Sequence, residues 1–220
     1  MLVSSRSFEE YCASFDLDPD QLPARILDCA AGASDFVAEA ARRGAAAVAA
    51  DPSYRRGAEV AELARAGMRS GNGMITSHQD RFTYAWYGSP EARTQMRNRA
   101  IQRFAVDHSA HPERYVAAEL PQLPFDDRAF DLAVCSHLLF TWATDLDEQW
   151  HHNAILELCR VATEVRIFPL VLQQTGDPVP FMEGLLARLA NAGITAERRT
   201  VAYEFQRGAN QMLLAKSSSL

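Results

Sequence analysis

The amino-acid sequence predicts an α/β fold with a seven-stranded, mostly parallel sheet and helices on both faces. Short apolar runs, typical of strands that are buried on both faces, alternate with segments of helical spacing. Two runs near the end of the chain indicate an antiparallel hairpin. The length of 220 residues suits one domain, 1–220. The expected strands are 26–29, 46–50, 115–119, 131–136, 164–170, 195–205 and 211–216.

The segment 25–54 is predicted to form a strand, a tight turn, a helix and a second strand. Small residues fill the turn 30–34, and Asp51 stands at the end of the second strand. Such a turn lets a ligand approach the backbone, and the helix after it directs free N–H groups at that ligand. A carboxylate at the next strand end can accept hydrogen bonds from both hydroxyls of a ribose. The unit therefore indicates a nucleoside-containing cofactor, either a dinucleotide or S-adenosylmethionine, although a plain βαβ unit without a ligand is an alternative.

The turn has the sequence Asp28-x-Ala30-x-Gly32-x-Ser34, which resembles the D-x-G-x-G-x-G motif of class I S-adenosylmethionine-dependent methyltransferases. Two of the family's three glycines are replaced, by Ala30 and Ser34. Both replacements are small, so a close approach to the backbone is retained. The G-x-G-x-x-G fingerprint of dinucleotide-binding proteins is not matched.

A second segment, 119–136, strengthens the resemblance. Glu119 stands four residues before Leu123-Pro124-Phe125, an acidic turn follows, and Phe130-Asp131 leads into the next strand. Class I methyltransferases commonly show this order, whereas dinucleotide dehydrogenases do not. The resemblance implies a Rossmann-like class I methyltransferase fold with an antiparallel last strand, and S-adenosylmethionine as the cofactor.

The same resemblance implies a role for particular residues. Asp28 and Gly32 are expected to hold the methionine end of the cofactor, and Asp51 its ribose. Glu119 and the Leu120 N–H are expected to hold the adenine. The cofactor-binding set predicted in this way is Asp28, Ala30, Gly32, Asp51, Pro52, Tyr54, Glu119, Leu120, Ser136 and His137.

His137 is the candidate catalytic residue. It follows the strand 131–136, whose end faces the transferred methyl group in the resembled fold. An imidazole titrates near pH 6.5 and can take a proton from a nucleophile. Many methyltransferases need no base and act by proximity and orientation, so a cofactor contact or a structural role for His137 remains the alternative.

About forty residues, 74–111, separate the helix after Asp51 from the next strand. We expect that helix to stop near Gly67 and the chain to break at 71–73. The segments 74–87 and 90–107 are then predicted to form a two-helix lid over the carboxyl ends of the strands, with simple aromatic packing as the alternative. An N-terminal helix, 7–15, is expected to lie over the cofactor or the substrate. The predicted lid and substrate residues are Tyr84, Trp86, Tyr87, Trp142 and Tyr203.

Composition narrows the classes of partner. The net charge of −6 argues against nucleic acid and favours a protein that handles small molecules. Four scattered cysteines indicate buried thiols in a reducing, cytoplasmic compartment. No apolar run approaches a membrane span, and no signal peptide is expected. Adjacent His151 and His152, and the pair His108 and His111, do not make a convincing metal site.

The predicted activity is direct, in-line transfer of a methyl group from S-adenosylmethionine to a small-molecule acceptor. One alternative keeps the cofactor but cyclises its aminobutyryl chain and releases methylthioadenosine. A further alternative is a cofactor-binding protein without turnover. The sequence does not identify the acceptor or the oligomeric state.

Overall fold

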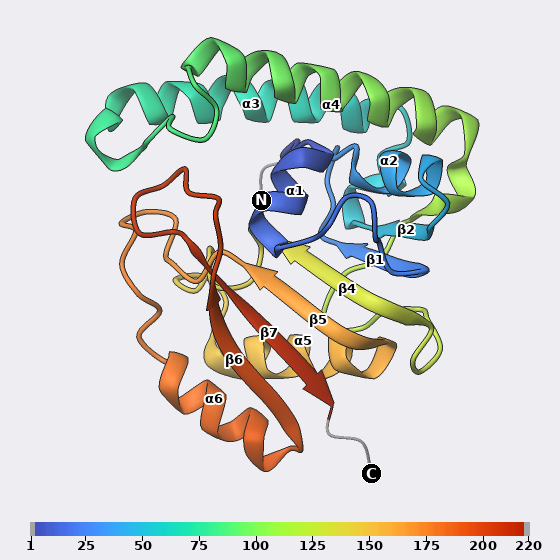
Figure 1. Ribbon diagram of the computed structural model, residues 1–220, viewed down its shortest axis with the longest axis vertical. Coiled ribbons are helices and arrows are strands. Elements are labelled where there is room, and N and C mark those ends of the chain that lie inside the picture. The colour runs from blue at the N-terminus through green and yellow to red at the C-terminus, as the bar shows by residue number, and fades with distance from the viewer. Residues whose placement is uncertain (1–2, 218–220) are drawn as a thin grey trace.

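A computed structural model, which describes residues 3–217, contains one seven-stranded sheet in the order β3-β2-β1-β4-β5-β7-β6 (Figure 1). The strands β1 to β5 are parallel to one another, and β7 runs antiparallel to both of its neighbours. The predicted fold class is therefore confirmed. The strands are β1 (Arg25–Cys29), β2 (Ala46–Ala50), β3 (Tyr115–Val116), β4 (Phe130–Ser136), β5 (Ala162–Phe168), β6 (Ile194–Thr200) and β7 (Gln211–Ser217).

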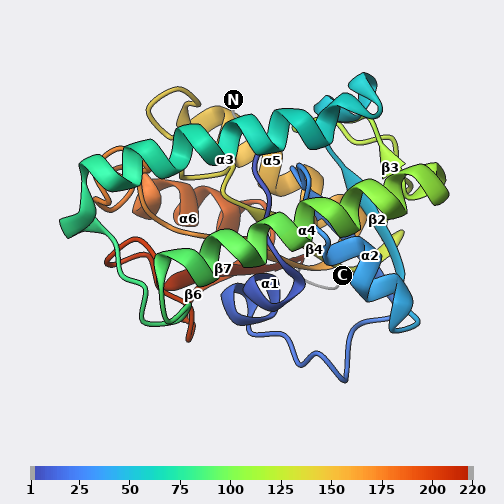
Figure 2. The same cartoon turned by 90° about the horizontal axis from the view of Figure 1, so that it is seen from above.

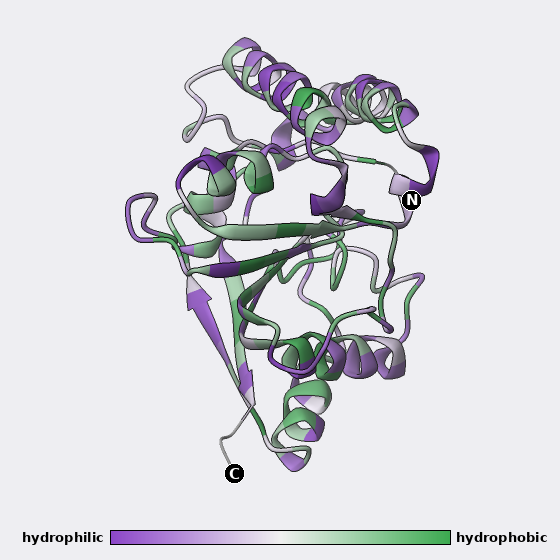
Figure 3. Cartoon of the chain, turned by 90° about the vertical axis from the view of Figure 1, so that its right-hand side faces the viewer, coloured by the Kyte–Doolittle hydropathy of each residue, from purple (hydrophilic) through white to green (hydrophobic). Residues whose placement is uncertain are grey.

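Helices cover both faces of this sheet. On one face α1 (Phe8–Phe15) and α2 (Phe36–Arg42) pack around the phenylalanine side chain of Phe36, which is fully buried. On the other face α5 (Glu148–Val161) and α6 (Met182–Asn191) enclose a second apolar core. The central strands are apolar along most of their length, as Figure 3 shows. Burial on both faces explains why their sequences are continuous apolar runs.

The two longest helices form an outer layer. Helix α3 (Glu59–Ser77) and helix α4 (Pro90–Ala110) run side by side across the molecule, above α1 and α2 in the view of Figure 1 (Figures 1 and 2). Ser89 caps α4, since its side chain accepts a hydrogen bond from the Ala92 N–H, and Pro90 occupies the first turn.

The start of this outer layer was predicted wrongly. Helix α3 does not stop near Gly67, and the chain does not break at 71–73, because α3 continues unbroken to Ser77. A glycine costs a helix only about 1 kcal/mol, and packing against α4 offsets that cost. The Asn72 side chain also accepts a hydrogen bond from Arg93 Nη1 of α4, at 2.9 Å. Instead of a separate helix, 78–89 holds a short 3₁₀ turn, Gln79–Arg81, and a loop.

The N-terminal helix is confirmed as α1, with Ser7 as its cap. Ser7 Oγ accepts from the Glu10 N–H at 3.2 Å, and the Glu10 carboxylate accepts from the Ser7 N–H at 2.8 Å. This reciprocal pair is a capping box. The segment before α1 crosses the turn that follows β1, where the Ser4 carbonyl accepts from the Ala33 N–H at 2.9 Å. The N-terminal segment therefore lies at the carboxyl ends of the strands.

Candidate active site

Two adjoining chambers lie at the carboxyl ends of the parallel strands. The first, here called the strand-end chamber, measures about 460 Å³ and lies against the ends of β1, β2 and β4. The second, here called the helix chamber, measures about 150 Å³ and is covered by α3 and α4. Four residues line both chambers and so mark where they meet: Val3, Ser4, His137 and Trp142.

The turn after β1 forms one wall of the strand-end chamber. Ala30 and Gly32 have left-handed backbone conformations, with φ of 62° and 58°. The Asp51 carboxylate joins the turn to the end of β2: Oδ2 accepts from the Gly32 N–H at 2.9 Å, and Oδ1 accepts from the Ser53 N–H at 2.8 Å. These bonds fix the carboxylate at the wall of the chamber.

The opposite wall of the strand-end chamber comes from the segment after β3. Glu119 and Leu120 line it. The Glu119 side chain is mostly exposed and lies 3.9 Å from Arg55. The Leu120 N–H makes no hydrogen bond to another residue in the described part of the chain. A carboxylate beside an unpaired amide donor suits a ligand edge that both donates and accepts hydrogen bonds.

Eight of the ten residues predicted to bind a cofactor line this chamber together. They come from four separate strand ends and are Ala30, Gly32, Asp51, Pro52, Glu119, Leu120, Ser136 and His137. A volume of about 460 Å³ falls within the usual range for small-ligand sites. Two carboxylates, a free backbone N–H and a turn of small residues therefore line one chamber.

The other two predicted residues lie behind the turn and outside the chamber lining. Asp28 is fully buried, and its Oδ1 accepts from Tyr11 Oη at 3.1 Å, while burial raises the pKa of its carboxyl well above the usual range. Tyr54 is also buried, and its hydroxyl donates to the Gly32 carbonyl at 2.9 Å. In this structure both residues support the turn and do not present atoms to the chamber.

His137 lies at the junction of the chambers. Its Nδ1 is 2.9 Å from Ser136 Oγ, and its backbone N–H donates to the Phe168 carbonyl at 2.7 Å. Burial, followed by the positive charges of Arg6, Arg97 and Arg93, holds the pKa of the imidazole well below its usual range. The ring is therefore neutral at pH 7, and the same burial and positive charges disfavour its protonation.

A group of charged residues beside His137 was missed in the sequence. Arg6, from the N-terminal segment, and Arg93 and Arg97, from α4, all line the helix chamber. Glu10 of α1 is fully buried behind them, and Arg97 binds its Oε1 through Nη2 at 2.8 Å and Nε at 3.1 Å. The spacing of Arg93 and Arg97, one helical turn apart on the buried side of α4, is the signal that could have indicated them.

The predicted lid aromatics divide into two sets. Tyr84, Trp86 and Tyr87 line neither chamber. Trp86 and Tyr87 instead pack edge-to-face against Tyr203, and the Tyr87 hydroxyl donates to the Glu10 carboxylate. Trp142 lines both chambers, and Tyr203 lines the helix chamber. Aromatic packing, the alternative weighed from the sequence, thus describes the first three residues.

Residues 3–217 contain no group of three or more side chains that could ligate a metal ion. No helix in this part of the chain is long and apolar enough to cross a membrane.

The chain has the fold of class I S-adenosylmethionine-dependent methyltransferases, as the strand order and the reversed β7 show. No protein-family model matches the sequence. The chain is 28% identical over 220 residues to the uncharacterized protein MJ0045 of Methanocaldococcus jannaschii, covering 98% of this chain and 96% of that protein.

Several solved structures resemble the fold. The pyocyanin biosynthetic protein PhzM shares 14% identity at a TM-score of 0.47, over 96% of this chain and 54% of PhzM, so the chain spans about half of that protein's length. The magnesium protoporphyrin IX methyltransferase of Synechocystis PCC 6803, with bound SAM, shares 12% identity at a TM-score of 0.47, over 91% and 72% of the two chains. The N-methyltransferase NodS of Bradyrhizobium japonicum WM9, in complex with S-adenosyl-L-homocysteine, shares 15% at a TM-score of 0.46, over 94% and 82%. The fold assignment rests on the strand order rather than on these likenesses.

Proposed function

We propose that the protein is an S-adenosylmethionine-dependent methyltransferase that acts on a small-molecule acceptor. The observation that carries this proposal is the meeting of two chambers at His137 and Trp142. The strand-end chamber has the size and the polar groups for a nucleoside sulfonium. The helix chamber offers separate space for a second molecule at the same strand end.

The residues of the strand-end chamber have distinct roles in this proposal. Asp51 accepts hydrogen bonds from the ribose hydroxyls, while Glu119 and the Leu120 N–H hold the adenine edge. The turn around Gly32 gives room for the methionine end. When bound, the cofactor supplies an electrophilic methyl group. Transfer needs the acceptor nucleophile, the methyl carbon and the sulfur in line, and we assign this orientation to the walls of the two adjoining chambers.

His137 is the candidate to receive the acceptor's proton, because it borders both chambers. Its lowered pKa keeps the imidazole neutral at pH 7 and able to accept a hydrogen bond, while the same burial and nearby arginines make the ring a weak base. The contact between Nδ1 and Ser136 Oγ holds the ring in one orientation. For acceptors that are already deprotonated, the same ring only borders the reacting atoms.

The primary test is binding followed by product analysis. Calorimetry should show heat on titration with S-adenosylmethionine and none with a nicotinamide dinucleotide. Incubation with a mixture of small metabolites should then yield S-adenosylhomocysteine. Methylthioadenosine as the product indicates cyclisation of the cofactor instead, and binding with neither product indicates a non-catalytic protein. No heat with S-adenosylmethionine contradicts the proposal as a whole.

A variant of Asp51 tests where the cofactor binds. Asp51→Ala removes charge-assisted hydrogen bonds worth about 1.5–3 kcal/mol each, so affinity for S-adenosylmethionine should fall about 10-fold or more. Asp20→Ala, at an exposed carboxylate far from the chambers, is the matched control and should bind normally. Unchanged affinity in Asp51→Ala removes this residue from the site.

A further inference from the structure

The helix chamber has an unusual balance of charge. Three arginines, Arg6, Arg93 and Arg97, are among its lining residues, and no aspartate or glutamate is. The carboxylate of Glu10 is fully buried behind the wall and faces Arg97, and the fully buried Asp28, whose carboxyl pKa is raised by burial, lies within electrostatic reach of Arg6. Positive charge therefore exceeds negative charge around this enclosed space.

Two of the three guanidiniums form no hydrogen bond or salt bridge with a carboxylate of residues 3–217. Arg93 is 5% exposed, and its Nη1 donates to Asn72 Oδ1 at 2.9 Å. Its guanidinium lies over the Phe205 ring, 4.4 Å from the ring centroid. Its buried Nε has no hydrogen-bond partner. Arg6 donates from Nη1 to Ser4 Oγ at 2.8 Å, and its buried Nε also lacks a partner.

Burial of charge without an opposite charge is costly. The arginine pKa values reflect this cost: burial, together with repulsion from Arg97, lowers the pKa of Arg93 to about 10 and also lowers that of Arg6. Arginine side chains stay protonated in proteins at pH 7. An anion in the helix chamber would offset the cost of burying these charges.

The remainder of the chamber is mostly apolar. Side chains from α3, β5 and the loops complete the wall, among them Met68, Met74, Ile75, Phe82, Phe168 and Val171. Its volume of about 150 Å³ matches that of an apolar protein cavity known to hold benzene. The chamber thus suits one ring or a short apolar chain.

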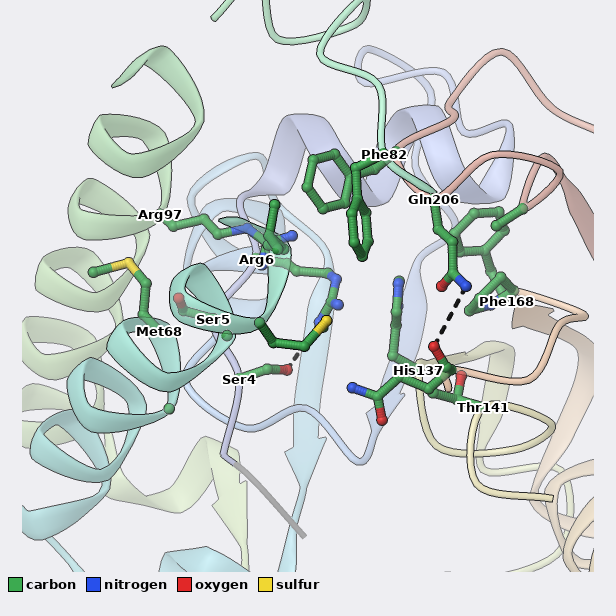
Figure 4. Close-up of a pocket in the computed structure, with 18 of the residues that line it drawn as sticks. Ser4, Ser5, Arg6, Met68, Phe82, Arg97, His137, Thr141, Phe168 and Gln206 are labelled. Carbon is green, nitrogen blue, oxygen red and sulfur yellow. Dashed lines mark hydrogen bonds between the residues drawn. The ribbon is translucent and has the colours of Figure 1, made fainter. Parts of the chain in front are cut away.

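Figure 4 shows how these groups face one another. Arg6 and Arg97 point toward the chamber from one side, His137 stands on the other, and Phe82 lies above the space between them. A molecule whose anionic group meets the arginines has its opposite side near His137, where the two chambers join.

We propose that the helix chamber binds a small, mostly apolar acceptor through a carboxylate or phosphate group held by Arg6 and Arg93. This inference deepens the proposed function and rests on it, because it names the chemical class of the acceptor. Arg97 forms a salt bridge with Glu10 and adds a third positive charge to the lining of the helix chamber.

The cofactor is the other source of a carboxylate. Arg6 and Arg93 line the helix chamber but not the strand-end chamber. This placement favours an anion that arrives with the acceptor. Measurements of cofactor affinity in the arginine variants separate the two sources.

The experiment uses three matched probes of the full-length protein: benzoate, phenyl phosphate and uncharged benzamide. Each is titrated calorimetrically with and without saturating S-adenosylmethionine. Either anion should bind at least about 10-fold more tightly than benzamide, because hydrogen bonds to charged groups are the strong ones. Arg93→Met should abolish this preference, and Arg93→Lys should restore part of it. Arg99→Met, at an exposed arginine of the same helix, should leave it intact.

Each remaining outcome counts for or against the proposal. Equal affinity for the anions and benzamide, or no binding of any probe, overturns it. A preference that survives in both Arg93→Met and Arg6→Met also overturns it. Loss of S-adenosylmethionine affinity in these variants with the benzoate preference unchanged assigns the arginines to the cofactor and overturns it. Anion preference in a protein that does not bind S-adenosylmethionine supports the anion site while refuting the proposed function. Melting curves identify any variant that fails to fold, and Arg6→Lys then replaces it.

Discussion

The carbonyl oxygen of Ser4 lies 2.5 Å from the position that a Cβ atom would take on Gly32. The N-terminal segment thus passes directly against the turn that forms the strand-end chamber. The Ala33 N–H, one residue further on, donates to the same carbonyl at 2.9 Å. A glycine is required at 32 for two reasons, the close contact and the left-handed φ of 58°.

Gly32→Ala should therefore destabilise the protein and weaken cofactor binding. The strained φ and the clash with backbone together should lower the free energy of unfolding by about 2–4 kcal/mol. Urea denaturation and calorimetry measure the two effects. Gly193→Ala is the control, because Gly193 also has a positive φ, 78°, but nothing within 4 Å of an added Cβ. If both variants lose the same stability, the contact with Ser4 has no energetic role.

Glu10 is predicted to be essential to the buried charge cluster. Glu10→Gln leaves the guanidinium of Arg97 buried without its partner, so the free energy of unfolding should fall by about 3–5 kcal/mol. Urea denaturation at pH 7 measures this loss. Glu9→Gln, an exposed neighbour on the same helix, should change it by less than about 0.5 kcal/mol.

The same pair of variants tests the sign of a pH effect. Burial alone would raise the pKa of Glu10, but Arg97 and Arg6 hold it below its usual value of 4.5. Because the folded pKa is the lower one, the stabilisation is fully present above pH 4.5 and is lost as pH falls through the folded value. Wild type should lose stability in that acid range, and Glu10→Gln should lose less. An equal loss in both proteins contradicts the assignment.

The sequence predicted those parts of the site whose residues follow a strand directly. Asp51, Glu119 and His137 each come just after an apolar run, and parallel strands end at the same edge of a sheet. Their convergence therefore follows from the fold class alone. The capped N-terminal helix was equally predictable, because Ser7 and Glu10 form a local capping box.

The arginine cluster was predictable only in part, because the spacing along α4 pairs Arg93 with Arg97 but Arg6 joins them only through tertiary packing. Arg6 comes from the N-terminal segment and Arg93 from α4, and no periodicity links them. The lid was misjudged for a related reason. Tyr87 is drawn away from the chambers by its contacts with Glu10 and Tyr203, both distant in sequence. The glycines at 67, 71 and 73 led to the prediction of a helix end, although α3 continues through all three.

The low pKa of His137 gives an electrostatic prediction that does not depend on turnover. Burial is the main cause, and Arg6, Arg97 and Arg93 add to it. Arg93→Met should therefore raise the pKa of the His137 ring, which imidazole NMR measures, while Arg99→Met should not. If the pKa of the His137 ring is unchanged in Arg93→Met, the electrostatic coupling between the two residues is refuted.

The same low pKa predicts how stability depends on pH. Because the folded pKa of His137 lies below the unfolded value of about 6.5, wild type should lose stability as pH falls below 6.5. His137→Gln should lessen that loss.

The glycines of α3 allow the helix chamber to be filled without disturbing the strand-end chamber. Gly71 lines the helix chamber, Gly73 is exposed, and an added Cβ meets nothing within 4 Å at either position. Gly71→Ala and Gly73→Ala should each stabilise the protein by up to about 1 kcal/mol, measured in urea.

Larger side chains should separate the two positions. Gly71→Leu places a branched side chain in the helix chamber, where one leucine occupies much of the 150 Å³ space. Benzoate affinity should therefore fall about 10-fold or more. Affinity for S-adenosylmethionine should stay within about 2-fold of wild type. Gly73→Leu should bind both molecules as wild type does. Calorimetry of the two variants makes the comparison. Benzoate binding that survives in Gly71→Leu shows that the anion does not enter the helix chamber, and an equal loss of both ligands shows that the two chambers do not act as separate sites.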